Sequence, residues 1–229
     1  ALRDAGLPIQ LAQALLRYAA VGGPQHILMC KLIRPESADA YDVIVRQAWD
    51  KVCGLRIGPQ GWEQAQLPMK DGGIAPGTLS QRASAAYLSS WTRTMSEVTR
   101  RTASANIQAL RHTDAVLDGE LTAAAHDLQQ RGVPEARIPF TERGPATRVV
   151  RQKHLVDFVH KSSRRRLEEQ LDEGGKGQLR SRSGQNSAAF MLFPTQQDHG
   201  VENDLFRATV AKRLGGRVLP KDEGVAPTC

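Results

Sequence analysis

The sequence predicts a mostly α protein: an irregular helical bundle of about six to seven helices in one or two subdomains, with at most one or two short strands. Apolar residues recur at the helical spacing of about 3.6 along most of the 229 residues. Aromatic residues make up only 5% of the chain while alanine is plentiful, which suits helices better than a β-sandwich or barrel. The length allows one large or two small domains with a substantial core.

Four apolar stripes occupy residues 1–132, which are predicted to form one helical subdomain. The first helix is expected to stop at Gly22-Gly23-Pro24, and the second to end at Gly54. Residues 27–33 are expected to add a short buried turn, and residues 54–77, rich in glycine and proline, to form a loop. Thr78 is predicted to cap the third helix with Gln81 as its capping-box partner, and Gly119 to break the fourth stripe in two.

A second helical subdomain is predicted over residues 148–229, after a linker at 133–147 that contains three prolines. A long helix over 147–172 is expected to end at the glycines of residues 174–177. Asn203 is predicted to cap a last helix that stops at Gly215-Gly216. The apolar run 188–193 fits either a strand or an extended segment docked on helices, and periodicity does not decide between them.

Positive charge is concentrated in one part of the chain. The formal net charge is +7, and residues 141–182 alone hold 11 basic and 6 acidic side chains. A row of cations on the solvent face of a helix is typical of proteins that follow nucleic-acid phosphates, because each neutralised phosphate releases counterions. The predicted phosphate-binding residues are Arg148, Arg151, Lys153, Lys161, Arg164, Arg165, Arg166, Lys176, Arg180 and Arg182.

The same residues allow a second interpretation, in which the charges only solvate a helix face. Arg164, Arg165 and Arg166 come shortly before Glu168, Glu169 and Asp172, so ion pairs one turn along the helix are also expected. The residues alone leave both interpretations open. The aromatic side chains Trp49, Tyr87 and Trp91 are predicted to belong to the core rather than to stack on bases.

The sequence contains no constellation of catalytic or metal-ligating residues. The run Gly175-Lys176-Gly177 lacks the other residues of a P-loop, and no adjacent Asp pair or Cys-x-x-Cys motif exists. The six histidines are scattered, and Asp198-His199 is expected to be a surface turn. We therefore expect no catalysis and no cofactor in this chain itself.

Three cysteines are too few and too scattered for a disulfide scaffold, so a reducing intracellular compartment, nuclear or cytoplasmic, is expected. Cys30 and Cys53 are predicted to be buried thiols. No stretch approaches ~18 uninterrupted apolar residues, so no membrane span is predicted. The chain opens at Ala1 without an initiator Met, from which we expect a piece of a longer polypeptide, with a processed mature chain as the alternative.

Three segments follow one another in a recognisable order. A Leu-Leu-Arg helix at 15–17 precedes an Arg-Pro segment, and a Leu-Pro-Met-Lys-Asp-Gly-Gly-Ile turn at 67–74 precedes an Ala-rich helix. A Leu-Arg-Ser-Arg-Ser-Gly run at 179–184 then precedes the predicted helix at 203–214. This order resembles the region downstream of the catalytic domain in reverse transcriptases of non-LTR retrotransposons, which lies just before a Cys/His zinc-knuckle-like motif.

The resemblance implies a non-catalytic thumb and linker region that grips template RNA or an RNA–DNA duplex by its backbone. It also implies an upstream polymerase domain in the same polypeptide, an RNA-directed DNA polymerase that uses Mg²⁺. Cys229 falls where the first ligand of a downstream Zn²⁺ motif is expected. The alternative function is a helical protein-interaction or scaffold module whose basic helix docks an acidic partner.

Overall fold

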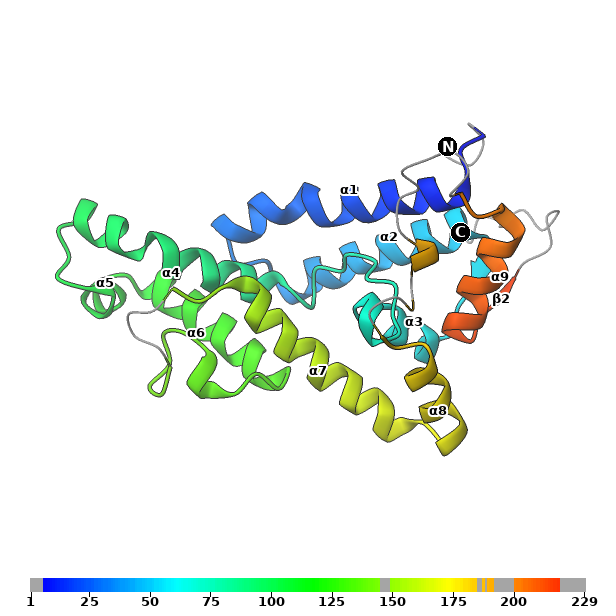
Figure 1. The fold of residues 1–229 in the computed structure, drawn as a ribbon. Helices are drawn as coiled ribbons and strands as arrows, with labels where there is room; N and C mark the ends of the chain where they lie inside the picture. Colours follow the sequence, from blue (N-terminus) through cyan, green and yellow to red (C-terminus); the bar gives the residue numbers. More distant parts are fainter. Residues whose placement is uncertain (1–5, 145–148, 185–186, 188, 192–199, 219–229) are drawn as a thin grey trace. The chain divides into compact units, whose positions relative to one another are not determined.

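The computed structural model describes residues 6–144, 149–184, 187, 189–191 and 200–218, and it confirms a mostly α fold (Figure 1). Within these residues there are nine α-helices: α1 (Ile9–Cys30), α2 (Pro35–Cys53), α3 (Pro59–Ala65), α4 (Ala83–Arg101), α5 (Ile107–Thr113), α6 (Ala115–Gln130), α7 (Gln152–Gln170), α8 (Glu173–Ser181) and α9 (Asn203–Leu214). Three 3₁₀ turns accompany them: η1 (Met69–Asp71), η2 (Glu135–Arg137) and η3 (Ala189–Met191). Two strands of two residues each, β1 (Leu55–Arg56) and β2 (Arg217–Val218), pair antiparallel with Leu55 opposite Val218.

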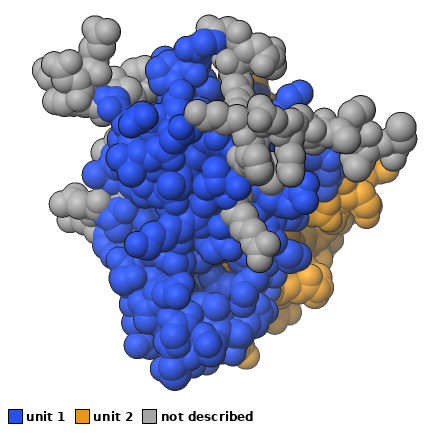
Figure 2. All heavy atoms as spheres, turned by 90° about the vertical axis from the view of Figure 1, so that its right-hand side faces the viewer, with its two compact units in different colours: residues 1–23, 40–78, 164–229 blue, residues 24–39, 79–163 orange. Residues whose placement is uncertain are grey.

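The chain divides into two compact units, each assembled from separate stretches of sequence (Figure 2). Unit 1 comprises residues 1–23, 40–78 and 164–229, and unit 2 comprises residues 24–39 and 79–163. The sequence predicts two subdomains, at 1–132 and 148–229, with a linker at 133–147 between them. That division stays a prediction.

Helix α1 does not stop at Gly22-Gly23-Pro24 but continues through them to Cys30. Proline lacks the N–H that would bond to the carbonyl four residues earlier, and it normally kinks or ends a helix. Here that carbonyl, on Ala20, accepts a hydrogen bond of 3.1 Å from the Tyr41 hydroxyl. The predicted buried turn at 27–33 is therefore wrong: residues 27–30 belong to α1, and Ile27 is 55% exposed.

Two other helices, α4 and α6, begin at residues that differ from those predicted. Thr78 does not cap α4, which begins at Ala83 after a turn that buries both Thr78 and Gln81. The break in the fourth stripe lies at Asp114 rather than at Gly119, because the Asp114 carboxylate accepts hydrogen bonds from the Val116 and Leu117 amides and starts α6.

The predicted long helix over 147–172 forms as α7, but a further helix, which the sequence does not predict, follows it directly. Helix α7 ends at Gln170, and Asp172 then caps α8 by accepting a 2.7 Å hydrogen bond from the Gly175 amide. The glycines of residues 174–177, which are predicted to end the long helix, instead lie inside the first turns of α8.

The predicted loop 54–77 contains a short helix, α3. Pro59 occupies its first turn, a position that proline favours.

The C-terminal helix α9 begins at Asn203, although that side chain does not cap it. The side-chain Oδ1 of Asn203 instead accepts a 2.8 Å hydrogen bond from the Ile9 amide. Gly215 ends α9 in the left-handed conformation, as predicted. Of the apolar run 188–193, residues 189–191 form η3, and the remaining positions lie outside the described residues.

Each unit has its own apolar core. In unit 1, Trp49 and Cys53 of α2 pack with Phe206 and Leu214 of α9 around the small sheet. In unit 2, Tyr87 and Leu88 of α4 pack with buried leucines of α6 and with Leu155 of α7. Trp49 and Tyr87 are 1% exposed and Trp91 is half-buried against the unit 2 core, as predicted. Cys53 is buried as predicted, whereas Cys30, the last residue of α1, is exposed, so that prediction is wrong.

Candidate functional site

The cations that the sequence singled out are distributed over both units. Arg148 lies outside the described residues. Arg151, Lys153 and Lys161 belong to unit 2. The other six belong to unit 1: Arg164, Arg165, Arg166, Lys176, Arg180 and Arg182.

Several of the unit 1 cations hold the protein's own structure. Arg164 forms ion pairs with Asp71 at 3.1 Å and with Glu168 at 3.0 Å, and its side chain is only 25% exposed. Arg165 pairs with Glu169 at 3.1 Å on the open surface. The pairs Arg164–Glu168 and Arg165–Glu169 are two of the ion pairs that the second interpretation of the sequence, a solvated helix face, expects.

Arg182 and Lys176 are engaged in a similar way. Arg182 donates to the carbonyl of Arg213 at 3.0 Å and to the Gln178 side chain at 2.8 Å, and burial lowers the pKa of its guanidinium. The Lys176 ammonium lies 2.7 Å from Glu173. Arg180 is exposed. A role of this group in binding nucleic acid stays a prediction.

A buried arginine that no sequence pattern indicates, Arg213 of α9, organises the turn at 67–74. Its guanidinium donates to the carbonyl of Met69 at 2.6 Å and to that of Gly73 at 3.1 Å, and it is 4% exposed. Gln64 donates to the carbonyl of Gly72 at 3.0 Å from the other side. Gly73 is thus held from α9, about 140 residues further along the chain, and Gly72 is held from α3.

In unit 2, a stripe of side chains runs from the residue that precedes α7 along the exposed side of that helix. We call Arg151, His154, Phe158 and Lys161 the α7 stripe; they recur every three or four residues and so share one face. The Lys161 ammonium lies over the Phe158 ring, 5.7 Å from its centroid. Lys153 is exposed as well, but its position two residues after Arg151 places it on another face.

A pocket of about 790 Å³ opens beside the α7 stripe. It is lined by the basic side chains Arg137, Arg151 and His154, and by apolar groups that include Val149, Leu155 and Phe158. Among the described residues that line it there is no carboxylate, and Arg137, Arg151 and Lys161 make no ion pair within the described part of the chain. We call this cavity the basic pocket.

The backbone that carries the basic pocket is fixed from α4. The carbonyl of Val150 accepts hydrogen bonds from the Ser89 hydroxyl at 2.8 Å and from the Thr92 hydroxyl at 3.4 Å. The amide of Val150 donates back to the Thr92 oxygen at 3.1 Å. Both hydroxyl residues are buried, so Arg151 follows an anchored residue.

The turn that carries Arg137 approaches α7 closely. Gly132 has a left-handed backbone with φ of +85°, and a Cβ at this position would collide with the Ser162 hydroxyl. Only glycine combines this backbone conformation with so close an approach. The 3₁₀ turn η2, five residues on at Arg137, therefore contributes to the same cavity as α7.

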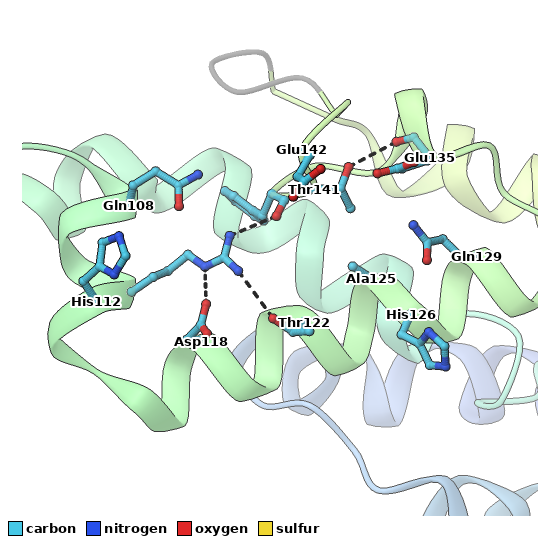
Figure 3. A pocket seen from close by; sticks show the side chains of 12 residues that line it. Gln108, His112, Asp118, Thr122, Ala125, His126, Gln129, Glu135, Thr141 and Glu142 are labelled. Atoms are coloured by element: carbon cyan, nitrogen blue, oxygen red, sulfur yellow. Dashed lines mark hydrogen bonds and ion pairs between the residues drawn. The ribbon is translucent and has the colours of Figure 1, made fainter.

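A second pocket of about 470 Å³ in unit 2 has a different character (Figure 3). Arg111 lines it, and Asp118 and Thr122 of α6, both labelled in Figure 3, accept hydrogen bonds from its guanidinium. Arg111 donates to Asp118 at 2.6 Å and to the carbonyl of Phe140 at 2.9 Å, which holds Phe140 at a φ of +65°. The Arg111 guanidinium is thus engaged in holding the loop at Phe140.

The described residues contain no group of three or more His, Cys, Asp or Glu side chains that could hold a metal ion. Asp198, His199 and Cys229 lie outside the described residues. No described helix is long and apolar enough to cross a bilayer.

Comparisons with protein-family models, with curated proteins and with solved structures find no match to this chain.

Proposed function

We propose that this chain binds the phosphate backbone of RNA or of an RNA–DNA duplex through the exposed cations of unit 2. The observation that carries the proposal is that Arg137 and Arg151 line one pocket, that Lys161 lies over Phe158 of the same pocket, and that none of these cations has an ion pair within the described residues. Asp157 is the only acidic residue in the stretch 149–161. Cations with this arrangement suit a polyanion whose charges repeat along a strand.

The ordered resemblance to non-LTR reverse transcriptases supports a more specific form of the proposal. In that form the chain is a non-catalytic, template-gripping region, and an upstream polymerase domain of the same polypeptide performs the Mg²⁺-dependent chemistry. The turn at 67–74, one of the three resembling segments, contains Gly73, whose missing side chain leaves room for the carbonyls of Leu67 and Gln64. This close approach gives a physical reason for the Gly-Gly pair within that motif.

The salt dependence of binding tests the proposal. We expect the affinity for a labelled RNA–DNA duplex, measured by fluorescence anisotropy, to fall steeply with salt. The double variant Arg151→Gln/Lys161→Gln should lower the slope of log K against log salt by about one per cation removed. The matched control is Arg100→Gln/Arg101→Gln, which removes two exposed arginines from α4 that pair with Glu97.

Two results would overturn the proposal. One is an affinity that does not change with salt, and the other is an equal loss in the double variant and in its control. The same assay with Arg165→Gln/Arg166→Gln examines the unit 1 cations while leaving the Arg164–Asp71 ion pair intact. Capture of an acidic protein that survives nuclease treatment, with no binding of the duplex, would favour the protein-interaction function instead.

A further inference from the structure

We propose that the basic pocket of unit 2 receives an unpaired nucleobase, so that the strand bound there is single-stranded at that point. This inference rests on the proposed function and names the part of the nucleic acid that unit 2 contacts. Its basis is the combination, in one cavity, of cations with a half-buried aromatic ring and exposed apolar surface.

The size and the lining of the pocket both suit a nucleotide. Its volume of about 790 Å³ lies within the range of about 300–1,000 Å³ that small-ligand sites occupy. Phe158 and Val149, which is 53% exposed, offer apolar surface to a planar base. Arg137 and Arg151 supply positive charge for the phosphate that accompanies it.

The α7 stripe extends this chemistry beyond one nucleotide. Lys161 lies 5.7 Å from the Phe158 ring centroid, one turn further along α7. Proteins that bind single strands combine such aromatic surfaces with cations that follow the backbone. A single phosphorylated tyrosine would engage the pocket but would leave Lys161 without an anion, which is why we favour a strand with several phosphates.

A base-paired strand cannot use the pocket without paying to unstack a base. The pocket itself requires little ordering upon binding, because Val150 is fixed to Ser89 and Thr92, and Gly132 packs against Ser162. The fixed cavity thus discriminates between an unpaired and a paired strand of equal charge.

The experiment compares a labelled oligouridine with a blunt RNA–DNA duplex of the same length by fluorescence anisotropy. Phe158→Leu should weaken oligouridine binding by about 5- to 150-fold, the range for one lost base–aromatic contact, and should leave duplex binding within about twofold. Because Phe158 also touches the unit 2 core, Val149→Ser provides a second variant at an exposed position. Val149→Ser should also weaken the binding of oligouridine more than the binding of the duplex.

A measurement on the unaltered chain complements the variants. An oligouridine that carries one 2-aminopurine should change its emission upon binding, because the emission of this base depends on its stacking. The change should be lost with Phe158→Leu and kept with Arg100→Gln/Arg101→Gln, which alters only the exposed surface of α4.

The outcomes separate the two proposals. If neither probe binds in a salt-dependent manner, the proposed function fails. If both probes bind with salt dependence but Phe158→Leu and Val149→Ser weaken them equally, the nucleobase pocket is wrong and the proposed function stands. Binding of a phosphotyrosyl peptide that depends on Phe158 and exceeds that of oligouridine would also overturn the inference.

Discussion

The hydroxyl of Tyr41 donates a hydrogen bond of 3.1 Å to the carbonyl of Ala20, the acceptor that Pro24 leaves without its backbone donor. Because a side chain of α2 supplies the missing bond, α1 continues through a sequence that would otherwise end it. The same contact explains why local sequence rules placed the end of this helix about eight residues too early.

Tyr41→Phe should lower the free energy of unfolding by about 1 kcal/mol, since it leaves the Ala20 carbonyl without this donor. In the background of Pro24→Ala the loss should be much smaller, because the new N–H at residue 24 can bond to Ala20. Urea denaturation of the four proteins gives the coupling energy. Strictly additive effects would show that the hydroxyl does not replace the proline's missing donor.

Two glycine substitutions should have opposite effects on stability. A Cβ on Gly73 would collide with the Leu67 carbonyl and lie 2.6 Å from that of Gln64, so Gly73→Ala should cost at least about 2 kcal/mol. Gly23 lies inside α1 with open space around it, so Gly23→Ala should stabilise the chain by about 0.5–1 kcal/mol. Thermal unfolding monitored by circular dichroism measures both, and an unaffected melting temperature for Gly73→Ala would contradict the packing of this turn.

Asp50 should make the protein less stable as the pH rises. Burial raises the pKa of its carboxyl from 3.8 to about 6, an effect that the nearby Arg46 only partly opposes. Between about pH 4 and pH 6 the folded chain therefore holds a proton that the unfolded chain has lost, and stability falls as the pH rises through this window. Asp50→Asn should be about 1–2 kcal/mol more stable than the unaltered chain at pH 7.5 and nearly equal to it at pH 4.

Urea unfolding at the two pH values checks this prediction, with Asp39→Asn as the control at an exposed position of the same helix. The control should show no comparable gain at pH 7.5. An Asp50→Asn variant that is equally or less stable than the unaltered chain at pH 7.5 would contradict an ionised, poorly solvated carboxylate at this position.

The cysteines should differ sharply in reactivity. Burial raises the pKa of the Cys53 thiol to about 12 and shields its sulfur, whereas Cys30 is exposed. Iodoacetamide at pH 8 should modify Cys30 in the native protein and Cys53 only after unfolding. Mass spectrometry of the separated peptides assigns each modification, and rapid native labelling of Cys53 would show that the core of unit 1 opens readily.

Sequence periodicity was sufficient for features that depend on nearby residues. The helical class follows from the spacing of apolar residues, and the end of α9 follows from Gly215, whose φ is +66°. It failed at Pro24, where the hydroxyl of Tyr41, a residue of another helix, supplies a hydrogen bond to the Ala20 carbonyl. It also gave weight to Gly119 over a local cap: the Asp114 carboxylate accepts hydrogen bonds from the amides of Val116 and Leu117 and so divides α5 from α6.

The candidate site was predictable to a similar extent. Arg151 and Lys161 stand out because they belong to a locally basic stretch of sequence. Arg137 does not, since only the turn at Gly132 and its contact with α7 bring it to the basic pocket. The anchoring hydroxyls of Ser89 and Thr92 are about 60 residues from Val150, so no local pattern could reveal them.

The division of unit 1 into three stretches of sequence has a consequence for synthesis on the ribosome. Its core needs Phe206 and Leu214, and its central turn needs Arg213, so it cannot be completed until nearly the whole described chain has emerged. Unit 2 ends at residue 163 and has all of its parts earlier. Although the first residues of the chain belong to unit 1, we expect unit 2 to fold first during translation, and the N-terminal part of α1 to await its partners.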